Sequence, residues 1–414
     1  MMRLAVLLLL ALARPAAAAD AEPITWEDCV VLASRQNPDL QSAGFARQAG
    51  RFSYYGSFNG LLPNLSLSNS YTDSGGGAAR WQGGLTASLS LFNAGDIAAV
   101  RSASAASDRT AALLRQAATD LRQDLRGAFL QVLYAQESIA VSSRILELRT
   151  RGSEMVALRY DAGRESKGNM MRANAQRVQA QSDLDQAQRN LRAGQRTLGR
   201  YLGYEEFHAF VTTGTLDAAP PPDLPRDFET ILAGRPDVAA EQAVVSGSEA
   251  GVWSARSPLF PALSASYSRT VTGASEFPSS NYGWTAIGAL SLPIFGGGPT
   301  ATYFAVSSAK QTLEKTRQDL RVVRGNALVD IESSWSGYAG AASSARVAAL
   351  LLDSARQRND EADIRYASGL LTYDNWEIIA SDRVSQERQA LQARLSAATN
   401  EAGWHHAFGR GLTE

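Results

Sequence analysis

The feature of this sequence that most constrains its fold is a duplication. Four short motifs in the first half of the chain recur in the same order in the second half, and the offset between copies grows only slightly along the chain. The paired copies lie at 37–40 and 235–238, at 62–66 and 260–264, at 89–95 and 290–296, and at 159–163 and 365–369. Chance is a poor explanation for such an order, so we predict a tandem repeat of one structural unit.

Each unit has the same predicted layout. A helix opens the unit, a proline stops helical structure, two strand-like runs follow around a Gly/Ser-rich loop, and a long helix leads to a shorter return helix. In the first unit, Thr25 and Asp28 fit a capping box and Pro38 suits an early helical position. The predicted divisions are a signal peptide at 1–19, a first repeat at 20–203 with strands at about 64–72 and 81–92, a linker at 204–227, and a second repeat at 228–414 with strands at about 262–272 and 282–294.

The first twenty residues are typical of an export signal. Arg3 gives a short positive region, Leu4–Leu12 an apolar stretch, and Ala17–Ala19 a small-residue cleavage site. The apolar stretch is about half of the roughly 20 residues that a membrane-spanning helix needs. The mature protein is therefore predicted to be exported. Cys29, the single cysteine, lies beyond the cleavage site and is predicted to be a packing residue.

The strand-like runs alternate apolar residues with small hydroxyl residues. In the first run, Leu65, Leu67 and Tyr71 alternate with serines and a threonine, and the other runs follow the same rule more or less strictly. This pattern and length are typical of transmembrane β-strands, apolar toward lipid and polar toward a wet lumen, although a soluble sheet with one solvated face would also alternate. Aromatic residues in these runs are expected at the membrane interface: Tyr71, Trp81, Phe92, Tyr267, Trp284 and Phe295.

Long heptad stripes follow the strand-like runs. After Phe92, apolar and small residues recur at alternating spacings of four and three, for example at Leu121, Leu125 and Ala128. A helix of about 55–60 residues would be roughly 80–90 Å long, far beyond the helices of ordinary globular domains. Shorter patterns return at about 170–202 and 373–403. We therefore predict long antiparallel helical hairpins with strand pairs at one end.

Four strands cannot close a barrel by themselves. Open sheet edges are not tolerated in lipid, and the smallest single-chain barrels use about eight strands. Two copies of the chain would supply eight strands, whose interior is filled by side chains, whereas three would supply twelve and leave a lumen. If the strands span a membrane, we therefore expect an oligomer of at least three chains.

The sequence contains no catalytic or metal-binding constellation. His405 and His406 are adjacent, so that on a helix they point about 100° apart, and His208 is isolated. The glycine runs at 75–77 and 296–298 lack a phosphate-binding signature. With a net charge of −1, the chain has no basic field for nucleic acid. We therefore predict no enzymatic activity, no cofactor, no metal site and no nucleic-acid partner.

Two other classes of protein compete with a membrane channel. An exported structural coiled coil without a channel would explain the heptads but not the alternation in the strand-like runs. An extracellular enzyme is less consistent with the sequence, because no cluster of His, Cys or paired carboxylates is apparent.

These motifs resemble those of the TolC-like outer-membrane efflux protein family, also called outer membrane factors. The resemblance extends over essentially all of the mature chain: the helix start at 24–28, the Asn-Pro-Asp-Leu and Arg-Pro-Asp-Val motifs, the Leu-Pro strand entry, the segment 284–298 and the two Arg-Tyr-x-x-Gly turns. It implies a mainly α TolC-like fold with a transmembrane β part. Each protomer of a homotrimer would give four strands to a shared 12-stranded barrel, and the hairpins would form an α-barrel in the periplasm.

The resemblance also implies a function and partners. A family member is a passive channel of the cell outer membrane, in contact with its lipid, and the 204–227 linker would lie in an equatorial belt. A periplasmic adaptor (membrane fusion) protein docks on the helical tips and connects the channel to an inner-membrane pump or ABC transporter. The cargo would be small toxic compounds, such as drugs or metal ions, in a tripartite efflux system, or polypeptides in type I secretion.

Within the family, the Arg-Tyr-x-x-Gly segments lie at the periplasmic tips, where the coiled coils narrow into a gate. The resemblance thus marks candidate gate and adaptor-contact residues in both turns: Tyr160, Gly163, Arg164, Glu165 and Lys167 in the first, and Tyr366, Gly369, Leu371, Asp374, Asn375 and Glu377 in the second. Family members often have an aspartate at the position of Asn375 and a gating arginine at that of Leu371. This chain differs at both positions, so the sequence is compatible with a charged constriction and with an apolar one.

Overall fold

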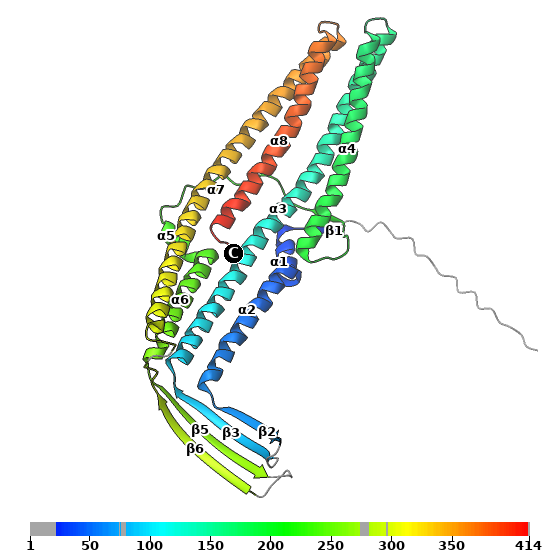
Figure 1. The fold of residues 1–414 in the computed structure, drawn as a ribbon. Helices are drawn as coiled ribbons and strands as arrows, with labels where there is room; N and C mark the ends of the chain where they lie inside the picture. The colour runs from blue at the N-terminus through cyan, green and yellow to red at the C-terminus, as the bar shows by residue number, and fades with distance from the viewer. Residues whose placement is uncertain (1–21, 74, 76–79, 274–280, 295–296, 413–414) are drawn as a thin grey trace, which may run out of the picture.

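The chain forms an elongated rod in a computed structural model that describes residues 22–73, 75, 80–273, 281–294 and 297–412 (Figure 1). A curved sheet lies at one end of the rod, the sheet end, and two long helical hairpins lie at the other, the tip end. We call the region between them, where the shorter helices meet, the equator. The predicted signal peptide at 1–19 and the predicted interface residue Phe295 lie outside the described residues.

The first repeat begins at the predicted capping box. The Thr25 hydroxyl accepts a hydrogen bond from the Asp28 N–H, and the Asp28 carboxylate accepts one from the Thr25 N–H. Asn37 ends this helix and caps the next, which has Pro38 in its first turn. The elements are α1 (Trp26–Gln36), α2 (Pro38–Ser57), the 3₁₀ turn η1 (Phe58–Leu61), β2 (Asn64–Thr72), β3 (Arg80–Phe92), α3 (Ala94–Asp161) and α4 (Lys167–Leu202).

The second repeat has the same order of elements. They are α5 (Phe228–Gly234), α6 (Pro236–Arg256), the 3₁₀ turn η2 (Ser257–Leu259), β5 (Ala262–Gly273), β6 (Asn281–Ser291), α7 (Ala301–Ala367) and α8 (Tyr373–Ala407). The strand β6 ends before the predicted limit at 294, because Pro293 has no N–H to donate to a strand ladder. A separate parallel pair, β1 (Glu22–Ile24) with β4 (Phe210–Thr212), lies at the equator.

The sheet has the strand order β2-β3-β5-β6, and its pairs are all antiparallel. The central pair joins the two repeats, since β3 belongs to the first and β5 to the second. The register keeps the hydroxyl residues of neighbouring strands on one face and the apolar residues on the other; Ser66, Thr86 and Ser268, for example, lie side by side. Among the described strands, β2 and β6 each pair on one side only, so the sheet has two unpaired edges.

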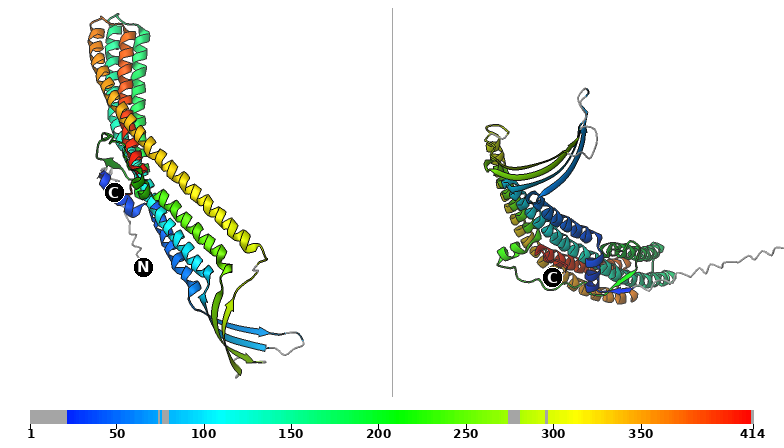
Figure 2. Two further views of the ribbon diagram at one scale, coloured as in Figure 1. Left: turned by 90° about the vertical axis from the view of Figure 1, so that its left-hand side faces the viewer. Right: turned by 90° about the horizontal axis from the view of Figure 1, so that it is seen from below.

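The helices form one curved layer that continues the sheet (Figure 2). The 68-residue α3 runs the whole length of this helical layer, roughly 100 Å. It packs against α2 and α6 toward the sheet and against α4 and α8 toward the tip, while α7 packs against α6 and α8. The main core lies near the equator, where the predicted stripe residues Leu125 and Val132 are fully buried beside Cys29. The predicted mainly α fold with a four-stranded β part and an internal repeat is therefore confirmed.

In the part of the chain that the structure describes, none of the helices has both the length and the hydropathy for a membrane span.

Candidate functional site

Both long hairpins turn through the same motif at the tip end. Gly163 has a φ of 69°, and its N–H donates to the Tyr160 carbonyl at 2.9 Å. The next N–H, from Arg164, donates to the Arg159 carbonyl at 2.8 Å. These bonds define a Schellman motif, which needs a left-handed residue and thus explains the glycine of Arg-Tyr-x-x-Gly. Gly369, with a φ of 79°, closes the second turn in the same way.

The two turns are tied to each other through Tyr366 of the second hairpin. Its hydroxyl donates to Glu165 Oε2 at 2.8 Å. The Arg159 guanidinium donates to the Tyr366 carbonyl at 2.7 Å and lies 4.6 Å from the centre of its ring. Tyr366 is fully buried by these contacts and its neighbours. The first hairpin therefore holds this tyrosine by a hydrogen bond at each end and a cation–π contact.

An aromatic cluster fills the space between the hairpins beside this contact. The Tyr366 ring stacks on Trp376 with 4.9 Å between centroids, and the Trp376 indole N–H donates to Asp363 at 2.6 Å. The first hairpin makes room with Gly152, where a Cβ would lie 2.9 Å from the Trp376 ring. Apolar packing therefore supports the polar contacts that Tyr366 makes between the two turns.

A buried ion pair joins the hairpins farther from the turns. Arg149 of α3 and Glu377 of α8 approach to 3.0 Å, and their side chains are only 11% and 6% exposed. Gln176 of α4 and Ser381 of α8 donate to the other carboxylate oxygen at 2.5 and 2.6 Å. This network offsets the cost of removing the two charges from water.

The negative charge of Glu165 is stabilised where it meets Tyr366. Partial burial alone would raise the pKa of its carboxyl group, but hydrogen bonds from the Asn169 side chain and the Ser166 N–H lower it. The Tyr366 hydroxyl and the Arg159 cation lower it further, and the net result is a pKa below the ordinary value. Burial and the Glu165 carboxylate raise the pKa of Tyr366, so its hydroxyl stays a donor at neutral pH.

The structure brings some of the predicted tip residues together and leaves others at the surface. Glu165 and Tyr366 are bonded to each other, Leu371 packs against the aromatic cluster, and Glu377 forms the buried ion pair. Tyr160 is half-buried, unlike its fully buried counterpart Tyr366. The other predicted side chains of the two turns are exposed: Arg164, Lys167, Asp374 and Asn375.

Sequence reasoning missed several residues that hold the tip together. Trp376 offered a signal, because a large aromatic at the start of a helix rich in polar residues is unusual there. Arg149 and Gln176 offered none. Each resembles a solvated residue of a long helix, and only the packing of one hairpin on the other distinguishes them.

The apolar face of the sheet is uncovered in the described chain. Leu67 is 83% exposed and Leu290 is 73% exposed, and a bare apolar face of this kind marks a contact with protein or lipid. Among the predicted interface aromatics, Tyr71 and Trp81 form a cross-strand pair at the loop end of the β2–β3 hairpin, with ring centroids 5.0 Å apart. Phe92 lies at the opposite end of β3. Two further aromatics lie within the strands rather than at their ends: Tyr267 and Trp284.

Each return helix ends against the residue that precedes the proline of its repeat. The Asn37 amide donates to the Tyr201 carbonyl at the end of α4, at 2.9 Å. In the second repeat, the Arg235 guanidinium donates to the Ala407 carbonyl at the end of α8, at 2.7 Å. These bonds satisfy carbonyls that a helix end leaves unpaired. The duplicated Pro motif thus joins the sheet-end helix of each repeat to its tip-end helix at the equator.

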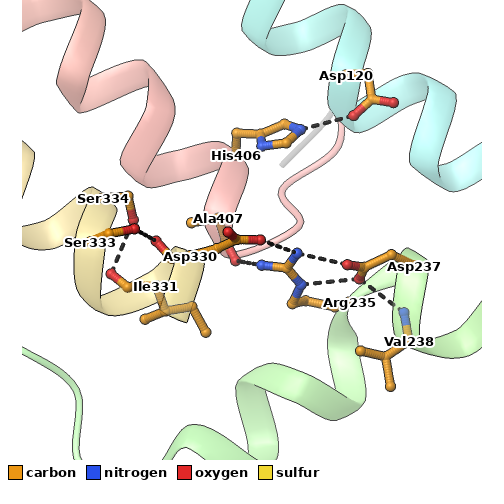
Figure 3. Close-up of polar contacts among 10 residues, drawn as sticks. All are labelled: Asp120, Arg235, Asp237, Val238, Asp330, Ile331, Ser333, Ser334, His406 and Ala407. Atoms are coloured by element: carbon orange, nitrogen blue, oxygen red, sulfur yellow. Dashed lines mark hydrogen bonds and ion pairs between the residues drawn. The ribbon is translucent and has the colours of Figure 1, made fainter. Parts of the chain in front are cut away.

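The junction of the second repeat is ionic (Figure 3). The Arg235 guanidinium lies 2.7 Å from Asp237 and 3.5 Å from Asp330 of α7. Burial opposes the positive charge, but both carboxylates outweigh it and raise the pKa of Arg235. His406 also contacts Asp120 of α3 at 2.8 Å. The second junction therefore joins α6 to α7 by a buried arginine and its carboxylates, and to α8 by a hydrogen bond. The first junction uses a neutral amide, and an ion pair beside it, Arg200–Asp39 at 4.0 Å, is exposed.

Over the residues that the structure describes, no three His, Cys, Asp or Glu side chains are grouped so that they could hold a metal ion.

The described chain thus combines a four-stranded sheet, which has two unpaired edges, with long helical hairpins that continue it. Residues 30–204 and 228–410 match the family model described as "Outer membrane efflux protein". The chain belongs to the outer membrane efflux protein family. It is an outer-membrane channel protein of efflux systems that extends into the periplasm, and it is not an enzyme.

Individual relatives are more distant. The chain is 25% identical over 295 residues to the cobalt-zinc-cadmium resistance protein CzcC of Cupriavidus metallidurans, covering 70% of this chain and 67% of that protein. It is 25% identical to nodulation protein T of Rhizobium leguminosarum bv. trifolii, covering 66% of this chain and 61% of the relative. In fold, the chain is similar to CusC (TM-score 0.84, 18% identity, 92% and 91% of the two chains) and to the open state of MtrE from Neisseria gonorrhoeae (TM-score 0.78, 21% identity, 93% and 89%).

Proposed function

We propose that copies of this chain close into one continuous duct, a β-barrel in the outer membrane and a tube of helical hairpins in the periplasm. The observation that carries the proposal is the pair of unpaired edges, β2 and β6, of the sheet that the structure describes. Each unpaired backbone group in lipid costs several kcal/mol, so β2 of one copy would pair with β6 of the next. The helices support the same closure, because α7 lies on the β6 side and α2 and α4 lie on the β2 side.

The number of copies follows from the size of the lumen. The sheet of one copy has the strand order β2-β3-β5-β6, so two copies would form a barrel of about eight strands and three a barrel of about twelve. Side chains fill the smaller barrel, whereas the larger leaves a water-filled passage. A homotrimer is therefore the smallest assembly that exports anything. The hydroxyl face of the strands, for example Ser66 and Ser268, would line its lumen.

The tip contacts would hold the periplasmic end of this duct closed. Tyr366 and Glu165 join the two turns, and Arg149 and Glu377 join the hairpins below them. Opening requires the hairpins of each protomer to separate, which breaks both contacts. Leu371, where the family often has an arginine, packs against the aromatic cluster. The closure is thus apolar and ionic within each protomer.

A passive duct needs partners that supply energy and cargo. The exposed tip residues Arg164, Lys167, Asp374 and Asn375 suit contact with a periplasmic adaptor, which would connect the duct to an inner-membrane pump or ABC transporter. We favour efflux of small toxic compounds, metal cations included, over type I secretion of polypeptides. The likeness to a cobalt-zinc-cadmium resistance protein supports this choice.

Conductance and mass together test the duct. Protein purified from outer membranes is expected to be a complex of three copies that gives discrete conductance steps in a planar bilayer. A monomer, or a complex that does not conduct, would contradict the duct. A conducting complex of two copies would contradict only the larger barrel.

Acid is expected to weaken the closed tip. The pKa of Glu165 is lowered in the closed form, so its contribution is complete above the ordinary value of about 4.3 and is lost as pH falls through the lower closed-form pKa. Single-channel conductance should therefore stay constant from neutral pH to about 5 and rise below about 4. A Glu165→Gln variant should lack the acid step; an unchanged step in this variant would assign it to another group.

A further inference from the structure

One row of the apolar sheet face contains a charge. The continuous register places Leu67, Leu85, Arg269 and Trp284 side by side, in that order across the four strands. The next row toward the loops contains Asn69, Gly83, Val271 and Tyr282, and the next row away from them contains Leu65, Ala87, Tyr267 and Ala286. Arg269 is the single charged residue among these three rows of the described sheet, and it is exposed.

Strict alternation in β5 fixes the face of Arg269. Its neighbours Ser268 and Thr270 belong to the hydroxyl face, and Tyr267 and Val271 belong to the apolar face. The ladder from β5 to β6 has no bulge over this stretch. Arg269 therefore lies on the face that the proposed duct turns toward lipid, which is unfavourable for an arginine unless the charge reaches a polar layer.

The Arg269 side chain extends toward the loop end of the sheet. Its guanidinium carbon lies 5.8 Å from the ring centre of Tyr282, which belongs to the adjacent row nearer the loops. Tyr267 and Trp284 stack beside it, with ring centroids 6.4 Å apart. An arginine that keeps its stem on an apolar surface and lifts its charge into an aromatic layer is snorkelling to the interface. The Tyr71–Trp81 pair lies one row beyond Tyr282 and marks the same layer.

The row above Arg269 contains a polar side chain. Gly83 in this row is itself buried and has no side chain. Asn69, across β3 in the same row as Gly83, adds an amide at about two strand spacings, roughly 10 Å, from β5. An arginine fork matches phosphate oxygens in geometry and charge.

We propose that Arg269 binds the phosphate group of a lipid in the outer leaflet of the outer membrane, at the loop end of the barrel. The occupant is a lipid-borne phosphate, because the site is continuous with the lipid-facing surface and its cation is aimed into the interfacial aromatic layer. Tyr282, Trp284 and Asn69 complete the site. This inference rests on the proposed placement of the sheet in the membrane.

Displacement of a brominated lipid tests the site in a Trp81→Phe background. There Trp284, directly opposite Arg269, is the one tryptophan left on the described sheet and serves as the reporter. The oligomer is reconstituted in phosphatidylcholine vesicles in which part of the lipid is brominated and quenches tryptophan fluorescence. Unbrominated phosphatidic acid, which carries a phosphate monoester, is then added. We expect phosphatidic acid to bind about fivefold more tightly than phosphatidylcholine, the effect of about 1 kcal/mol for one arginine near an anionic lipid.

The Arg269→Gln variant should bind both lipids equally. Arg80→Gln removes the same charge from the hydroxyl face, since Arg80 pairs with Thr72, and should keep the wild-type preference. A wild-type protein without preference, or a preference that survives Arg269→Gln, would overturn the site. Suppression of the preference by millimolar inorganic phosphate would also overturn it, because the site would then take a free anion. Absence of any quenching by brominated lipid would instead contradict the membrane placement of the sheet.

Discussion

Replacing Glu377 with alanine is expected to open the tip. The change leaves the Arg149 guanidinium buried without its counter-ion, and removing one partner of a buried ion pair costs about 3–5 kcal/mol. Because the pair joins α3 to α8, this cost falls on the closed contact between the hairpins. A loss of about 3 kcal/mol changes the ratio of closed to open tips by more than a hundredfold. Single-channel recordings should therefore show a much higher open probability.

Two further variants separate this effect from general damage. Glu147→Ala breaks an exposed pair with Arg151 on the same helix, at 3.5 Å with both side chains about two-thirds exposed, and should change closure by less than about 0.5 kcal/mol. Arg149→Met with Glu377→Leu replaces the buried pair by apolar groups and should restore closure. If Glu377→Ala lowers thermal stability but leaves the conductance of the wild type, the pair is structural and lies outside the gate.

Periodicity made most of the fold predictable. The heptad stripe through Leu125 and Val132 can only be buried by a second long helix, and the alternation through Leu65 and Leu67 requires a two-sided sheet. Both patterns depend on residues close in sequence, and the duplication provided each twice. The end of β6 was harder, because the apolar run continues past Ser291 to Pro293 and beyond.

The tip could be located from sequence but its contacts could not. The Arg-Tyr-x-x-Gly motif marked the turns, because a turn that needs a positive φ favours glycine at that position. The Tyr366–Glu165 hydrogen bond joins residues 201 positions apart. No local sequence pattern shows which face of the first hairpin packs against the second hairpin. Arg269 is a similar case. Alternation places it on the apolar face. Its contact with Tyr282 and its place opposite Trp284 depend on how β5 pairs with β6, which the sequence alone does not show.

One added methyl group at Gly203 is expected to disrupt the equatorial junction. Gly203 ends α4 with a φ of 87°, and a Cβ there would lie 2.4 Å from the Gln36 carbonyl oxygen. The left-handed conformation alone costs a residue with a side chain about 1–2 kcal/mol. The clash adds to this cost, because the Gln36 backbone is held by the neighbouring Asn37–Tyr201 hydrogen bond. Gly203→Ala should therefore lower the thermal unfolding midpoint of the purified oligomer substantially.

The duplication supplies a graded control for this change. Gly409 occupies the matching position after α8, with a φ of 71°, but a Cβ there would meet Pro236 Cδ at 2.9 Å rather than a backbone oxygen. Gly409→Ala should therefore destabilise less than Gly203→Ala. Gly234, at the end of α5, has open space around its Cβ position, so Gly234→Ala should be neutral or slightly stabilising. Equal midpoints for all three variants would contradict this prediction, because the clash at Gly203 would then cost no more than the open position at Gly234.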